Sequence, residues 1–253
     1  MSFISAIVVA VDFSEHSDAA LSRALSLAAA LGVSLHIVHV HQKPASWDEM
    51  ESDVVEAMER YAKRAAERGV YSTTDILEGD VVTTLREALR DYAADLLVIG
   101  TRGVGRVRRA VFGSVAERAM REVAAPVLVV GETGDRAAEP IGKILFASDF
   151  SEPASEAFEQ SLELAKRLSA SIEVVHVVNP AGEVSGPYGV PASAKTIAER
   201  DERIRAQLDR TRRALVESGV EGATVPLRGT EEAALAERIR SSGSDLVVVG
   251  ASS

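Results

Sequence analysis

The sequence contains no cysteine, so a disulfide framework is excluded and any metal site would have to use histidines and carboxylates. Aromatic residues make up only 4% of the chain, which leaves little material for stacking nucleic-acid bases. Basic residues are outnumbered by acidic ones, and the formal net charge is −10. A general DNA or RNA binder needs a dominant basic face, so we expect no nucleic-acid partner.

Long apolar runs are missing as well. The first apolar segment is short, has no basic residue before it, and is interrupted at Asp12. This pattern matches neither a secretory signal nor a membrane span. We therefore expect a cytoplasmic protein with no membrane partner.

What the chain does contain is an internal repeat. Two blocks match their counterparts at constant offsets of 137 and 150 residues, namely 7–40 with 144–177 and 77–100 with 227–250. Asp12 and His39, for example, recur as Asp149 and His176. The two offsets differ by 13, so the second copy carries thirteen extra residues between the blocks. We place them in the segment 179–196, whose proline and glycine content indicates a loop.

Two homologous domains are the simplest account of this repeat. We expect a complete first domain at 1–131, a linker at 132–142 and a second domain at 143–253. At an offset of 150 the given sequence ends opposite Gly103, so the second copy has no counterpart of residues 104–131. We expect the second domain to be truncated and degenerate.

Within each copy, short β-branched runs alternate with longer helical patterns, which is typical of βαβ units around a parallel sheet. In the first copy we predict strands near 4–11, 34–41, 72–77, 95–100 and 126–131, and helices near 16–31, 49–68, 80–93 and 113–123. Ser14 and Asp80 precede helices that their side-chain oxygens can cap. The predicted fold class is α/β, with two tandem open parallel sheets covered by helices on both faces. The second sheet lacks its last helix and strand.

Glycines cluster directly after the fourth predicted strand. Gly100, Gly103 and Gly113 let the backbone approach an anion closely, and Ser114 adds a hydroxyl at the start of the next helix. The unpaired amides and the positive dipole end of that helix favour phosphate. In an open parallel sheet such a site lies beyond the carboxyl ends of the strands, where Asp12 and Ser14 also belong.

The segment "VAVDFSEHSDAAL" after the first strand, the spacing G-x-x-G-x9-G-S and the later "APVLVV" resemble the universal stress protein family. The resemblance covers all of the first copy and nearly all of the second. It implies a flavodoxin-like or Rossmann-like fold with sheet order 3-2-1-4-5. It also implies binding of ATP, with Mg as a further candidate ligand. Many members of the family form homodimers through the last strand, so a homodimer is expected.

The resemblance also implies a nucleotide site. Asp12 corresponds to an acidic residue on the ribose or adenine side, and Val40 to a strand residue whose main chain meets adenine. Around the ribose and phosphates it places Gly100, Arg102, Gly103, Gly113, Ser114 and Val115. We add Ser14 because it lies at the same predicted sheet edge.

Other nucleotide-binding motifs fit less well. The first strand-helix turn has no glycine for a G-x-G-x-x-G fingerprint, and no glycine is followed by Lys and then Ser or Thr as in a P-loop. His36, His39 and His41 share one strand face and raise a metal hypothesis. Only His39 recurs in the second copy, so we expect no metal site.

The function predicted is that of a cytoplasmic stress protein that binds an adenine nucleotide in its first domain and regulates an interaction. Slow ATP hydrolysis or phosphotransfer stays an alternative, although the sequence shows no dedicated lysine, acidic pair or base near the glycine loop. We therefore assign no catalytic residue. A partner-binding module without a ligand is the other alternative. The remaining arginines of the loop, at 106, 108 and 109, are most simply solvated.

Overall fold

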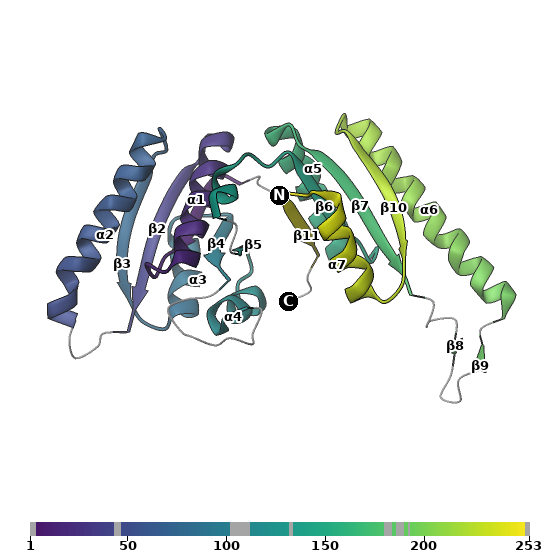
Figure 1. The fold of residues 1–253 in the computed structure, drawn as a ribbon, viewed down its shortest axis with the longest axis horizontal. Helices are drawn as coiled ribbons and strands as arrows, with labels where there is room; N and C mark the ends of the chain where they lie inside the picture. Colours follow the sequence, from purple (N-terminus) through teal and green to yellow (C-terminus); the bar gives the residue numbers. More distant parts are fainter. Residues whose placement is uncertain are drawn as a thin grey trace. The chain divides into compact units, whose positions relative to one another are not determined.

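The computed structural model describes residues 4–42, 47–101, 112–131, 134–179, 184–185, 190–191 and 193–250. Contacts divide the chain into two units, of which the first ends at Pro140 and the second begins at Ile141. Each unit has its own parallel sheet, and Figure 1 shows the helices and strands of both. The 3-10 helix η1 (Gly134–Ala138) lies within the segment predicted as a linker.

The first unit is built on five parallel strands in the order β3-β2-β1-β4-β5. The strands are β1 (Ala6–Ala10), β2 (Ser34–His41), β3 (Ser72–Glu78), β4 (Leu96–Gly100) and β5 (Val127–Val130). The helices are α1 (Glu15–Leu31), α2 (Trp47–Glu67), α3 (Val81–Asp91) and α4 (Ser114–Glu122). The predicted elements of the first copy are confirmed to within two residues at each end, as is the sheet order implied by the resemblance.

Helices cover both faces of this sheet because its strands are apolar on both sides. On one face, Val8 and Leu97 are fully buried beneath a cluster that α3 and α4 complete with the side chains of Val82, Leu85, Leu89, Ala116, Ala119 and Val123. Ile7 and Val9 alternate with Val8 along β1 and are also fully buried, which places them on the opposite face. The close contact of α1 with β1 and β4 covers that face.

Helix α1 also holds the end of the first unit. Arg23 lies on α1 and is only 7% exposed. Its guanidinium donates to the carbonyl of Arg136 at 2.8 Å and to that of Glu139 at 2.7 Å. These hydrogen bonds attach η1 and the residue that follows it to the helical layer of the first unit.

The second unit repeats this architecture with four parallel strands in the order β10-β7-β6-β11. The strands are β6 (Lys143–Ala147), β7 (Ser171–Val178), β10 (Gly222–Arg228) and β11 (Leu246–Val249), and the helices are α5 (Glu152–Leu168), α6 (Ala194–Ser218) and α7 (Glu231–Ser242). Over the described residues, the prediction of a second sheet without a fifth strand is confirmed.

The segment 179–196 is less irregular than predicted. Two-residue strands β8 (Val184–Ser185) and β9 (Val190–Pro191) pair antiparallel within it, and α6 already begins at Ala194. Val184 and Val190 stand on either side of the sequence Ser-Gly-Pro-Tyr-Gly, so β-branched residues flank a turn-forming stretch. The loop prediction overlooked this short pairing.

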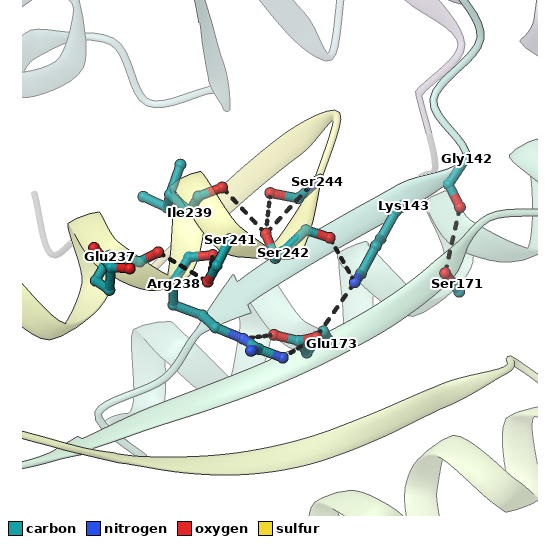
Figure 2. A network of polar contacts seen from close by, with 10 residues as sticks. All are labelled: Gly142, Lys143, Ser171, Glu173, Glu237, Arg238, Ile239, Ser241, Ser242 and Ser244. Carbon is teal, nitrogen blue, oxygen red and sulfur yellow. Dashed lines mark hydrogen bonds and ion pairs between the residues drawn. The ribbon is translucent and has the colours of Figure 1, made fainter.

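A buried carboxylate distinguishes the second sheet. Glu173 on β7 corresponds to His36 in the first unit and is 7% exposed. Figure 2 shows it between two cations: Arg238 of α7 donates to both carboxylate oxygens, at 2.7 Å for Nη2 to Oε2, and Lys143 Nζ lies 3.4 Å from Oε2. Lys143 Nζ also donates to the Ser242 carbonyl at 2.8 Å. The Arg238 hydrogen bonds are the main reason that the pKa of Glu173 is lowered.

Replacing Arg238 with Met tests this cluster, because among the described residues Glu173 then keeps Lys143 as its one neighbouring cation. We expect Arg238→Met to lower the free energy of unfolding of the second unit by about 2 kcal/mol at pH 7. Since the folded-state pKa of Glu173 is below 4.5, this stabilisation is complete above pH 4.5 and disappears as the pH falls through the lowered value. Urea denaturation over that pH range measures it.

The matched control is Arg240→Met, which removes an exposed ion pair between Arg240 and Glu237 on the same helix. An exposed pair contributes within about 0.5 kcal/mol, so this variant should unfold like the wild type. Equal losses in the two variants would contradict a specific role for the buried carboxylate.

Candidate functional site

The strand order places a switch point between β1 and β4. From β1 the chain runs outward through β2 to β3 and then returns to β4 on the other side of β1. The two strands are neighbours, with Ile7 opposite Leu96. In open parallel sheets, connections that diverge in this way leave a crevice beyond the carboxyl ends of the strands, where ligands bind. Asp12 follows β1 and Thr101 follows β4 at this edge.

A strained turn follows β1. Asp12 Oδ1 accepts hydrogen bonds from Ser14 N–H at 3.1 Å and from Ser14 Oγ at 2.6 Å. Ser14 is the N-cap of α1 and accepts from Ser17 N–H, as predicted for a cap. Between them Phe13 has a φ of +64°, a left-handed conformation that costs a bulky residue about 1–3 kcal/mol. The turn holds the Asp12 carboxylate at the sheet edge.

Aromatic packing stabilises this turn. The centroid of the Phe13 ring lies 4.6 Å from that of His39 on β2 and 5.8 Å from that of Tyr61 on α2. Tyr61 in turn donates its hydroxyl to Asp18 Oδ1 at 2.7 Å, and burial raises the pKa of that hydroxyl. Sequence reasoning missed Phe13 and Tyr61. The recurrence of Phe13 as Phe150 in the repeat was the available signal.

Helix α4 begins against the end of β4. The Gly113 N–H donates to the Thr101 carbonyl at 2.7 Å, which brings Gly113 and Ser114 to the carboxyl edge. Gly113 is the N-cap of α4 and has no side chain to accept from the first turn. Side-chain oxygens of Ser or Asp cap α1, α3, α5 and α6, whereas α4 and α7 have no such cap hydrogen bond. The first-turn amides of α4, including that of Val115, keep their capacity to bind an anion.

An ion pair links α4 to the start of α3. Arg118, one turn into the helix, donates to Asp80 Oδ2 at 3.0 Å and to Asp80 Oδ1 at 3.2 Å. Asp80 is also the N-cap of α3 and accepts from Thr83 N–H at 3.1 Å, which confirms the predicted cap. The contact with Arg118 is the largest reason that the pKa of Asp80 is lowered. The starts of α3 and α4 are therefore joined.

Gly100 has a packing role that sequence reasoning did not identify. A Cβ at this position would lie 2.9 Å from the carbonyl carbon and oxygen of His16 in the first turn of α1. The absence of a side chain lets α1 sit directly on the end of β4. Gly250 in the second unit repeats this, because its Cβ would lie 2.6 Å from the backbone of Ala154.

Most of the predicted site residues lie at this edge. Contacts run from the Asp12 turn and Ser14 to the first turn of α1, on to Gly100, and through Thr101 to Gly113 and the start of α4. Val40 lies on β2, two residues beyond the last partner of β1. Val115 is 38% exposed in the first turn of α4. Arg102 and Gly103 lie outside the described residues.

The histidines of β2 have local partners. His36 Nδ1 bonds to Thr73 Oγ1 at 2.9 Å, and its ring stacks on Tyr92 with centroids 4.3 Å apart. His39 Nδ1 bonds to the Val11 carbonyl at 2.8 Å. In the described part of the chain, no group of three His, Asp or Glu side chains is placed to hold a metal ion. Over the same residues, no helix has the length and apolar character needed to cross a membrane.

The second unit keeps the turn after its first strand. Asp149 Oδ1 accepts from Ser151 N–H at 2.9 Å, and Phe150 has a φ of +61°. The Phe150 ring stacks on His176 with centroids 4.4 Å apart. Within the described residues this unit has no helix in the position of α4. The turn is therefore common to both units. The helix that starts at Gly113 occurs in the first unit and has no counterpart in the described part of the second.

The model of the universal stress protein family matches residues 4–131 and 140–253. The chain belongs to the universal stress protein family. A universal stress protein from Methanocaldococcus jannaschii is 34% identical over 137 residues, which cover 49% of this chain and 80% of that protein. One from Mycolicibacterium smegmatis is 28% identical over 219 residues, or 80% of this chain and 71% of that protein.

Solved structures show the same fold. The crystal structure of a universal stress protein from Archaeoglobus fulgidus has a TM-score of 0.69 at 21% identity, and the match covers 97% of this chain and 85% of that one. The family predicted from the motifs is thus confirmed.

The packing role of Gly100 can be separated from ligand binding. In this member of the universal stress protein family, we expect Gly100→Ala to lower the unfolding free energy of the first unit by about 1–3 kcal/mol without any ligand, because the Cβ meets the His16 backbone. Gly113→Ala is the matched control, since its φ of −77° suits alanine and the change of cap residue costs less than about 1 kcal/mol. Urea denaturation of the ligand-free variants measures both. Wild-type stability of Gly100→Ala would refute the packing role.

Proposed function

We propose that the first unit binds ATP at the carboxyl edge of its sheet and thereby regulates an interaction with another protein in the cytoplasm. The observation that carries this proposal is the start of α4, which has no side-chain cap and lies against the end of β4 beside the Asp12 turn. Helix N-termini bind phosphate through their amides and dipole. Membership of the universal stress protein family supports the same assignment.

Each site residue receives a role under this proposal. The Asp12 carboxylate accepts from ribose hydroxyls, and the Val40 main chain meets adenine. The amides of Ser114 and Val115 and the Ser114 hydroxyl bind phosphate oxygens, with Mg as an additional counterion. Ser14 acts through Asp12, because its hydroxyl already donates to that carboxylate.

The other predicted site residues have roles in the same proposal. Gly100 and Gly113 give the backbone its close approach to the ligand. Arg102 and Gly103 belong to the segment between Thr101 and Gly113, which we propose contacts the phosphates and carries the signal to a partner.

We expect one nucleotide site per chain. The second unit has the matching turn at Asp149, but its described residues hold no counterpart of the Gly113–Ser114 helix start. A ribose-side contact without a phosphate-side contact gives weak binding, since charge-assisted hydrogen bonds contribute the most per contact.

Isothermal titration with ATP tests this expectation. The wild type should bind about one equivalent, and Asp12→Asn should weaken binding about tenfold, because the amide keeps the Ser14 contacts but loses the charge. Ser114→Ala should weaken it by a similar factor. Asp149→Asn is the matched control in the second unit and should bind like the wild type. Two equivalent sites, or no binding at all, would contradict the proposal.

We also propose that the chain forms a homodimer through strand edges. Among the described strands, β5 pairs only with β4 and β11 pairs only with β6, so each presents an open edge of a parallel sheet. Such edges are normally paired or covered. Light scattering should report twice the mass of one chain, and a monomer mass throughout a concentration series would exclude the dimer.

A further inference from the structure

The pairing of β1 with β2 ends one step before the candidate site. The last pair in register is Ala10 with Val38, and the Val11 N–H still donates to the Val38 carbonyl at 2.9 Å. In a continued parallel ladder, the Val11 carbonyl would accept the next hydrogen bond from the Val40 N–H. Among the described residues it accepts instead from His39 Nδ1, at 2.8 Å.

This bond defines the state of the His39 ring. A carbonyl oxygen only accepts, so Nδ1 carries the proton. Burial is the largest reason that the pKa of His39 is lowered, which keeps the imidazole neutral near pH 7. The Phe13 ring lies against one side of it, with centroids 4.6 Å apart. The imidazole N–H thus takes the place that the Val40 N–H would have in a continued ladder.

The hydrogen bond between His39 and the Val11 carbonyl also determines which main-chain groups are available at the end of β2. Main-chain groups alternate in direction along a strand, so the Val40 N–H and C=O face the same side as those of Val38, toward β1. At the level of Val40, β1 has already ended and the chain has turned at Asp12. A neighbouring donor and acceptor on Val40 therefore face the edge where the ligand is proposed to bind.

We infer that His39 is a positioning residue. Because its Nδ1–H donates to the Val11 carbonyl, the Val40 N–H stays available to a ring nitrogen of the nucleotide base. This inference rests on the proposed function. An N–H beside a C=O matches a base edge that presents an acceptor beside an amino group, as adenine does with N1 and N6. Hypoxanthine presents N1–H and a carbonyl instead, so ITP pairs poorly with Val40.

The second unit contains the same arrangement and provides a control. His176 Nδ1 bonds to the Ser148 carbonyl at 2.7 Å, while the Ser148 N–H donates to the Val175 carbonyl at 2.9 Å. Here too the ladder ends one step early, with Ala147 opposite Val175. A change at His176 therefore disturbs an equivalent bond far along the sequence from the proposed ATP site.

Amide hydrogen exchange at Val40, followed by NMR, tests the inference directly. In the ligand-free wild type this amide should exchange rapidly, and saturating ATP should slow it about tenfold or more. In His39→Leu the Val40 N–H can close onto the Val11 carbonyl, so the amide should be slow without ATP. ATP should then bind about tenfold more weakly, the effect of one lost hydrogen bond, and the preference for ATP over ITP should fall.

Two further variants make the result specific. His39→Asn places an amide nitrogen near the position of Nδ1, so it should restore fast Val40 exchange and ATP affinity. His176→Leu should alter neither the exchange rate of the Val40 amide nor the affinity for ATP. A slow Val40 amide in the ligand-free wild type would overturn the inference without any variant, as would wild-type ATP affinity in a folded His39→Leu.

These outcomes are distinct from failure of the proposed function. If the wild type binds no ATP, the proposed function fails and the assigned role of His39 fails with it. If ATP binds while the His39 variants leave affinity and Val40 exchange unchanged, only the role of His39 is refuted.

Discussion

The early end of pairing between β1 and β2 is the constraint on which the candidate site depends. After Ala10 the chain keeps one more main-chain bond and then turns sharply at Phe13, whose left-handed backbone costs about 1–3 kcal/mol. Ring packing on His39 and the hydrogen bonds between Asp12 and Ser14 offset this cost. The turn separates the two strand ends and directs the start of α1 onto β4, where Gly100 leaves room for it.

Both units have this turn, but the side chains around it differ. In the first, His36 stacks on an aromatic ring at the end of α3, whereas its counterpart Glu173 is held by two cations in the second. Ile99 is 3% exposed beneath α4, but Val249 at the end of β11 is 57% exposed. The shared turn is therefore a property of the fold. The helix that begins at Gly113, after the fourth strand, has no counterpart in the described part of the second unit.

Much of the fold could be predicted from the sequence, because periodicity reports which faces are buried and the repeat supplies a second reading of the same pattern. The caps at Ser14 and Asp80 followed from residue type and position. Phe13, His39 and Glu173 could not be assigned in the same way. Their roles depend on partners from other strands and helices, and local patterns do not specify which side chain meets which carbonyl. For the same reason the glycine motif indicated the site at Gly100 but not the packing of α1 there.

We propose that an adenine nucleotide binds between the end of β2 and the start of α4 in the first unit, and that the second unit does not bind it. Mapping amide chemical shifts during a titration with ATP tests this placement most directly. We expect the amide shifts of Asp12, Val40 and Ser114 to change together, while those of Asp149 and Val177 in the second unit stay constant. Changes confined to the second unit, or spread without relation to the carboxyl edge of the first sheet, would contradict it.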